Sequence, residues 1–310
     1  MFLNALMLMA ACGEKDGTVD DTGAVDLFDT FVFITDVDGN VKSEPAGGDL
    51  SCYTPGDPWL TNSADPSCQA EQTFNSEDGE SIVEDFEEGD AVPDATLELW
   101  WSDSTSGASD QETTSNASGE VSGTLMTCTP FTYRTSTDAD LEETVTTIQA
   151  HEIYAFKPDG KPHSAQFYSV STKTYNIIPA LLGITPKPGY GIAAGTAYDC
   201  NGDPVEFVQV VTKDGDGNIV EDQVVQYFRE DFPNRDQHWT SADGLWVIMN
   251  IPPGTFTVEM YGLNAAGEHD LLGTTILEVV GDSINIANAF YGFDGGVVYP
   301  ESCQTACSAE

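Results

Sequence analysis

Seven cysteines are the residues whose types and positions most constrain the chemistry of this chain. One of them, Cys12, follows a short apolar segment at the start. The other six are Cys52, Cys68, Cys128, Cys200, Cys303 and Cys307. An even number of cysteines in an exported chain predicts disulfides, here three, although six cysteines permit fifteen pairings. No Cys-x2-Cys pair is present, so the spacings do not fit a closed zinc site.

The sequence favours one of these pairings. Cys52 and Cys68 bracket a loop rich in Pro, Asp and Asn, and we expect a disulfide between them. Cys303 and Cys307 could close a small terminal loop, or one of them could pair with Cys200.

Two short runs of acidic and amide side chains could bind calcium, which prefers oxygen ligands. They are Asp36, Asp38 and Asn40, and Asp214, Asp216 and Asn218. An EF-hand counted from Asp214 would need glycine at its sixth position and an acid at its twelfth, but these are Ile219 and Val225. A hairpin turn, in which Gly and Asn adopt positive φ, is the favoured interpretation of each run. Calcium is the one cofactor that the sequence suggests.

No known catalytic motif is present. His151-Glu152 is followed by Ala155, where the zinc-peptidase motif H-E-x-x-H requires a second histidine. The other histidines lie in separate segments, and no G-x-S-x-G motif occurs. We therefore expect no catalytic residues. The alternative is an accessory or uncharacterised enzyme of the cell envelope, hydrolase or dioxygenase-like, with its site on loops between strands.

Tryptophans are the remaining signal for a ligand site, because their rings can stack on a sugar or pack against a protein. Trp59 and Trp239 are the candidates for a glycan or protein ligand. Trp100-Trp101 and Trp246 lie in alternating strand patterns, where successive side chains face opposite sides, so we expect core positions among them.

The charge of the chain excludes one class of partner. Its 310 residues hold 10 Lys and Arg against 52 Asp and Glu, a net charge of −42. Such a field repels phosphate backbones, so we expect no nucleic acid partner. A hydrophobic content of 40% is that of a globular protein, and the length allows two domains.

The start of the chain predicts export. Residues 2–11 are apolar but too short to span a bilayer, as in a signal peptide. Met9-Ala-Ala-Cys12 resembles the bacterial lipobox, whose cysteine is lipidated, so residues 1–12 are interpreted as signal peptide and lipobox. Residues 13–29 are rich in Asp, Gly and Thr and are interpreted as a flexible acidic tether. The prediction is an exported protein, lipid-anchored at the outer membrane or cell surface.

The rest of the chain is predicted to be all-β, because short alternating segments are separated by Gly, Pro, Asp and Asn turns. The clearest strands are expected at 192–199, 205–212, 219–228, 245–250, 255–262, 271–280 and 283–291. One short helix is expected after Ser171 or Thr172, which could cap it, and Gly183 would end it.

An internal repeat organises these strands. Gly119 precedes Phe131-Thr132 by the same number of residues as Gly244 precedes Phe256-Thr257. Gly89-Asp90 and Gly202-Asp203 mark a matching earlier turn. We expect two tandem sandwiches, at 30–168 with the disulfide loop as an insertion and at 191–310, joined by a helix and Pro/Gly linker at 169–190.

The second copy resembles the carboxypeptidase regulatory-like domain, a transthyretin-like sandwich. The resemblance rests on Asp199, Gly202, Pro204, Val205, Val208, Val210, Asp243-Gly244, Pro252-Pro253-Gly254 and Thr257-Val258. It covers residues 191–291 and is weak over 80–135, where Cys128-Thr129-Pro130 replaces Pro-Pro-Gly. It implies two immunoglobulin/transthyretin-like β-sandwiches in tandem with one short connecting helix. In the family this domain is an accessory, separate from the catalytic zinc domain.

These observations together predict a non-catalytic, lipid-anchored cell-surface protein that acts as a binding, adhesion or spacer module. The membrane, through Cys12, is its expected partner, with a protein or glycan ligand as a second. The repeat itself is scaffold, so specific function is expected in the Cys52–Cys68 loop, the polar span after Trp101 and the loop around Trp239.

Overall fold

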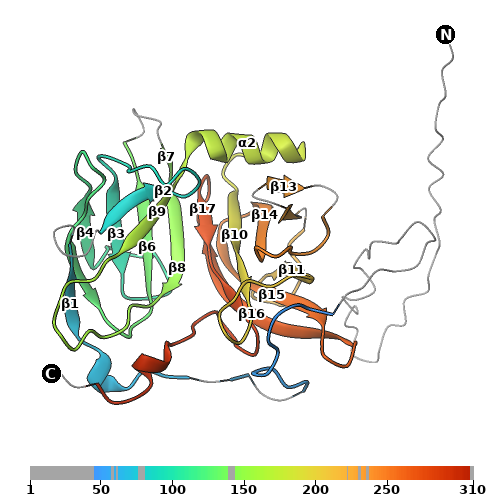
Figure 1. The fold of residues 1–310 in the computed structure, drawn as a ribbon. Helices are drawn as coiled ribbons and strands as arrows, with labels where there is room; N and C mark the ends of the chain where they lie inside the picture. The colour runs from blue at the N-terminus through green and yellow to red at the C-terminus, as the bar shows by residue number, and fades with distance from the viewer. Residues whose placement is uncertain are drawn as a thin grey trace, which may run out of the picture. The chain divides into compact units, whose positions relative to one another are not determined.

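The computed structural model describes residues 45–307, except 57, 58, 61, 76–80, 139–143, 222, 230, 231, 235 and 236. Cys12, Asp36, Asp38 and Asn40 lie outside the described residues. The described part is nearly all β-structure, with one α-helix, which confirms the all-β fold class (Figure 1).

The first sandwich contains strands β1 to β9. Their bounds are β1 Glu71–Phe74, β2 Ile82–Asp85, β3 Thr96–Trp100, β4 Gln111–Thr114, β5 Gly123–Met126, β6 Phe131–Ser136, β7 Thr144–Val145, β8 Thr147–Glu152 and β9 Gln166–Ser171. One layer has the order β4-β3-β6-β8, and the other has β2-β9-β7. The β1-β5 pair joins the second layer, because an isolated bridge links Ile82 to Glu120, just before β5.

The second sandwich contains strands β10 to β18. Their bounds are β10 Gly191–Tyr198, β11 Val208–Lys213, β12 Val224–Arg229, β13 Phe232–Asn234, β14 Leu245–Ile251, β15 Gly254–Leu263, β16 His269–Val279, β17 Ile284–Ile286 and β18 Ala289–Phe290. One layer runs β13-β12-β14-β10-β17, with β18 also paired to β10, and the other runs β11-β15-β16. Aliphatic side chains from both layers, with Trp246 and Tyr227, fill its core.

The internal repeat is confirmed by irregular features that recur at matching places. Asp94 and Phe207 both have positive φ, 54° and 64°. In the residue after each, the backbone N–H donates to a buried hydroxyl: Ala95 N to Ser115 Oγ at 2.8 Å, and Val208 N to Thr240 Oγ1 at 3.1 Å. Each of these contacts lies within its own sandwich. Two segments of unlike sequence therefore have the same local fold.

One predicted strand is divided by the structure. Residues 219–220 continue the hairpin with β11, since the N–H of Val220 donates to the carbonyl of Thr212. The chain then crosses to the other layer, where β12 pairs with β14 from Val224. The expected strand over 219–228 therefore serves both layers, and the short strand β13 that follows was not expected.

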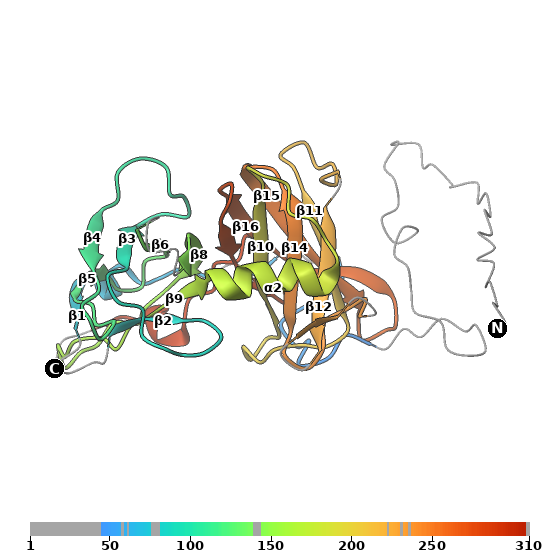
Figure 2. The same ribbon diagram turned by 90° about the horizontal axis from the view of Figure 1, so that it is seen from above.

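The connecting helix, α2 (Thr172–Leu182), is capped as predicted. The Ser171 side chain accepts the N–H of Thr174, and Gly183 ends the helix with φ 65°. Leu182 is buried against strands of both sandwiches, in a cluster that includes Val170 of β9 and Ile192, Val247, Met249 and Ile284 of the second sandwich. In Figure 2 the helix begins beside β8 and β9 and runs across the strands of the second sandwich. Ile177 and Leu181 on the same helix are 40% and 47% exposed.

Candidate functional site

The junction between the two sandwiches is held by contacts that neither sandwich needs for its own fold. Strand β17 pairs in parallel with β10 of its own sandwich and also with β8 of the first, where Ile284 faces Thr147. One sheet therefore passes from β13 to β4 through both sandwiches. Backbone hydrogen bonds across this boundary hold the two units in one register.

Polar side chains add to this boundary from the span after Trp101. The N–H and hydroxyl of Thr105 donate to Glu278 Oε2 of β16, at 2.6 and 3.1 Å. His151 Nε2 lies 2.6 Å from the carbonyl oxygen of Ile276, and its Nδ1 lies 3.4 Å from Asp103 Oδ1. The hydrogen bond from His151 lowers the pKa of the Asp103 carboxyl below its usual value. The polar span, expected to carry a specific function, is thus used here to join the sandwiches.

Three disulfides correct the predicted pairing, and two of them tie the first sandwich to the end of the chain. Their partners are Cys52 with Cys200, Cys68 with Cys307, and Cys128 with Cys303. The Cys52–Cys68 pairing was wrong, and so was the small loop closed by Cys303 and Cys307. All six cysteines form disulfides, but each connects segments that are far apart in the sequence.

The reason is that each end of the described chain runs along the sandwich at the opposite end of the sequence. Near the start, the N–H of Ala46 donates to the carbonyl of Leu263, and that of Gly47 to Glu206. Near the end, residues 299–307 reach the first sandwich (Figure 1, blue and red segments). The two end segments meet at Leu60 and Phe293 in a parallel bridge. The expected boundaries, 30–168 and 191–310, are therefore crossed by both ends.

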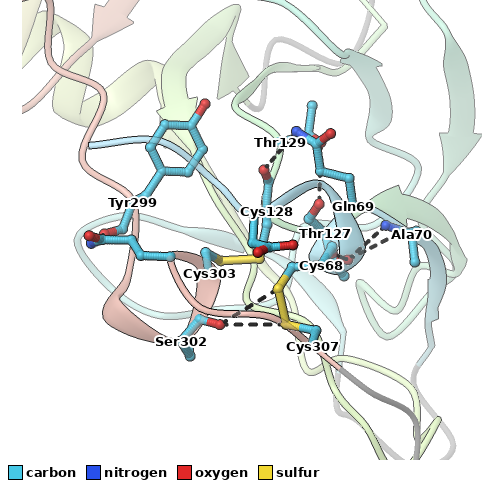
Figure 3. Close-up of a disulfide and its surroundings, with 12 residues drawn as sticks. Cys68, Gln69, Ala70, Thr127, Cys128, Thr129, Tyr299, Ser302, Cys303 and Cys307 are labelled. Carbon is cyan, nitrogen blue, oxygen red and sulfur yellow. Dashed lines mark hydrogen bonds between the residues drawn. A yellow bond between two sulfur atoms is a disulfide. The ribbon is translucent and has the colours of Figure 1, made fainter. Parts of the chain in front are cut away.

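Two of the disulfides lie together in a small core of their own (Figure 3). Cys68, Cys128 and Cys303 are fully buried. The Thr127 hydroxyl donates to the carbonyl of Cys68 at 2.6 Å and accepts the N–H of Ala70 at 3.2 Å, which fixes the backbone beside the sulfurs. The side chains of Ile153, Phe156 and Tyr299 pack against this cluster. The cross-links are therefore part of the interior.

The calcium candidate over residues 214–218 forms a hairpin turn. Asp214 Oδ1 accepts the N–H groups of Asp216 at 3.0 Å and Asn218 at 2.8 Å, and Gly217 has φ 82°. Asn116 and Asn264 cap their turns with the same two bonds. The turn chemistry accounts for Asp214, and a calcium role for it stays a prediction.

Asp199 uses the same turn and adds a long-range bond. Its Oδ1 accepts the N–H groups of Asn201 and Asp203, at 2.8 and 2.9 Å, while Oδ2 accepts the N–H of Asp49 at 2.7 Å. Burial opposes ionisation, but the backbone donors, led by Asp49, outweigh it and lower the pKa of the Asp199 carboxyl below its usual value. The charged side chain thereby holds the start of the described chain beside Cys200.

The aromatic candidates are partly covered. Trp59 and Trp239 are both half-buried, and Trp239 packs edge-on against Phe207 with ring centroids 5.9 Å apart. Trp100 and Trp246 are buried, as the strand pattern predicted. Among the described residues, no contact joins Trp59 to Trp239.

Among the described residues, the acidic residues, histidines and cysteines do not gather into a metal-binding group. Within residues 45–307, leaving aside the gaps given above, no cluster of three or more His, Cys, Asp or Glu could hold a metal ion. His163 is buried, which lowers its pKa to about 4, and its Nε2 lies 2.9 Å from Gln72 Oε1. No helix in this same part of the chain is long and apolar enough to cross a membrane.

Comparison with known proteins gives distant structural matches. No family model and no curated protein matches the chain. Among solved structures, the Bacillus anthracis TIE protein is 14% identical over 72% of this chain, with a TM-score of 0.20, and the match covers 33% of that protein. A shaft pilin from Lactobacillus rhamnosus GG is 9% identical over 75% of this chain and 100% of its own, with a TM-score of 0.22. A minor pilin from Streptococcus agalactiae is 11% identical over 74% and 98%, also at 0.22.

Proposed function

We propose that the protein is a non-catalytic module of the cell surface, which holds whatever it carries or binds at a fixed distance and orientation. One arrangement supports this most: a continuous sheet joins the two sandwiches, two disulfides tie the first sandwich to the chain that follows the second, and a third holds the start of the chain to the second. Interfaces between domains of one chain otherwise permit relative motion. Here the polar and covalent features serve to remove that motion, as a spacer requires.

Disulfides form and persist in oxidising compartments, which supports export. The lipid anchor at Cys12 and the tether over residues 13–29 complete the proposal. The second sandwich then acts as a carboxypeptidase regulatory-like accessory domain. A Cys12→Ala variant is expected in the soluble fraction, and continued membrane partitioning of that variant would contradict the anchor.

Rigidity is tested by the distance distribution between two spin labels on the oxidised protein. Genetically encoded, non-cysteine labels at exposed Glu112 of β4 and Glu268 of the β15–β16 turn report on the two sandwiches without disturbing the disulfides. A single narrow distribution is expected. A broad distribution in the oxidised protein would overturn the spacer function.

Calcium is tested on the same molecule. If Asp214 and Asp216, or Asp36 and Asp38, hold the ion, EDTA should lower the melting temperature, and added calcium should restore it. An unchanged melting temperature would remove calcium from the proposal and leave the spacer function standing.

A further inference from the structure

We infer that the Cys68–Cys307 disulfide removes both sandwiches from the path of a stretching force. The inference rests on the proposed function only in supposing that a surface spacer bears tension. Force that enters before Cys52 and leaves after Cys307 would pass from Cys68 directly to Cys307. The 239-residue separation between them, which contains every strand of both sandwiches, is bypassed.

The covalent connection fixes how far the ends can separate. An unfolded chain extends by at most about 3.5 Å per residue, so 239 residues could release roughly 800 Å. With the disulfide intact, this length cannot be released, whatever happens to the hydrogen bonds inside the loop. Only the chain between the point where the force enters and Cys68 stays in the path, and its part from Cys52 to Cys68 is about 16 residues or roughly 55 Å when extended.

That segment is itself held against the other end of the chain. The N–H of Leu60 donates to the carbonyl of Gly292 at 2.8 Å, and the N–H of Asp65 donates to that of Cys303 at 2.7 Å. The N–H of Cys307 donates to Ser67 Oγ at 2.9 Å. These bonds would oppose straightening of the segment before the disulfide takes the full load.

The other two disulfides have different places in this path. Cys128–Cys303 lies beside the first disulfide and would limit extension if the first were absent, to the residues from 68 to 128 and from 303 to 307. Cys52–Cys200 runs from a residue before Cys68 to one inside the bypassed loop and so offers only a longer route to Cys307, and its removal leaves the shortest path unchanged. The three cross-links are chemically alike, and only one of them controls the extension.

Single-molecule stretching tests this with the full chain between two marker domains of known unfolding force. The oxidised protein is expected to release at most about 80 Å, the extended length of residues 45–68, before the markers unfold. The Cys68→Ser/Cys307→Ser variant should release roughly 200 Å more, from the residues up to the second disulfide. The matched control, Cys52→Ser/Cys200→Ser, should behave as the unchanged protein does.

Stretching the unchanged protein in reductant keeps the test decisive if a variant does not fold, and a release approaching 800 Å is then expected. Release of several hundred ångströms from the oxidised protein would overturn the inference, and so would equal release from the control and the test variant. A broad spin-label distribution with a short stretching release would reject the rigid spacer and keep the force path. A narrow spin-label distribution with a long stretching release would keep the rigid spacer and reject the force path.

Discussion

The two sandwiches share a folding plan but differ in what stabilises them. The second has an extensive core of Val, Ile, Leu and Met side chains. The described core of the first is smaller and depends on aromatic pairs, such as Phe74–Phe167 at 5.4 Å and Tyr133–Phe167 at 5.2 Å between ring centroids. Two disulfides tie the first sandwich to the end of the chain, and one ties the start of the chain to the second.

The difference shows that one fold can be stabilised in two ways, mainly by a hydrophobic core or by a smaller core together with disulfides. A small domain buries a smaller share of its surface, so its hydrophobic stabilisation per residue is weaker. A cross-link that closes a long loop offsets this by lowering the conformational entropy of the unfolded chain. The copy with the smaller core is the one with more cross-links.

The largest expected effect comes from removing Cys128–Cys303, one of the two cross-links in the small core. The Cys128→Ala/Cys303→Ala variant should lose about 3–5 kcal/mol in the free energy of unfolding of the first sandwich. Native-state hydrogen exchange should show faster exchange at β3 and β6 and little change at β14 and β15.

The matched variant is Cys52→Ala/Cys200→Ala, which removes the single cross-link of the second sandwich. Its larger core should keep β14 and β15 protected. If either variant lost protection equally in both sandwiches, the claim that the first sandwich depends on its disulfides and the second on its core would be contradicted.

A second pair of substitutions tests whether a glycine at the same place in both sandwiches is equally intolerant of a side chain. Gly119 and Gly244 have φ 75° and 66°, and a Cβ on them would lie 2.8 Å from the Val83 carbonyl oxygen and 2.6 Å from that of Ala197. Each change to Ala should cost about 2–4 kcal/mol, since backbone strain and a steric clash add. Gly267→Ala is the control, because its φ is 77° but nothing lies within 4 Å. Denaturant unfolding that ranks the control with the other two would refute the clash.

The buried hydroxyls should give a smaller effect. Ser115→Ala and Thr240→Val leave the N–H groups of Ala95 and Val208 without their acceptor, at an expected cost of about 1–2 kcal/mol in the free energy of unfolding. Thr240→Ser keeps the hydroxyl and should be near neutral. If chemical denaturation shows a cost in one copy alone, the two sites are not equivalent.

The smallest effect should come from the turn carboxylates and should depend on pH. Because the pKa of Asp199 is lowered in the folded state, its contribution to stability is present above its unfolded pKa of about 4 and is lost as the pH falls below it. Asp199→Asn should cost roughly 1 kcal/mol at neutral pH, since an amide cannot accept all three N–H groups. It should also reduce the loss of stability between about pH 5 and 2.

Asp214→Asn is the control for this change, because the two turn N–H groups share one oxygen that an amide also supplies. Asn already occupies the equivalent position at 116 and 264. Thermal melts across the pH range that place Asp214→Asn level with Asp199→Asn would show that the Asp49 bond contributes nothing.

Much of the fold could be predicted because its determinants are local. Alternating side chains and turn residues located the strands of the second sandwich, and Ser171 with Gly183 located the helix. The repeat was visible because Gly119 and Gly244 each meet a carbonyl oxygen that allows no side chain. Such constraints act within a few residues and leave a pattern in the sequence.

The junction could not be predicted because its determinants are distant in the sequence. The Cys52–Cys68 pair was favoured by the Pro-, Asp- and Asn-rich loop that it brackets, but the start of the chain first runs along the second sandwich. Nothing around Thr105 or His151 distinguishes them from ordinary surface residues, and their partners on β16 lie more than 120 positions later. Contacts of this kind can be identified only once the positions of both sandwiches are known.

The crossed ends also set an order of events during biosynthesis. Cys68 and Cys128 are synthesised long before Cys307 and Cys303, their partners at separations of 239 and 175 residues. During that interval Cys52 and Cys68 are free and close in sequence, so a premature bond between them is the natural error. Correct maturation then requires thiol–disulfide exchange that reopens this bond, a step that takes seconds to hours depending on the oxidant and on catalysis.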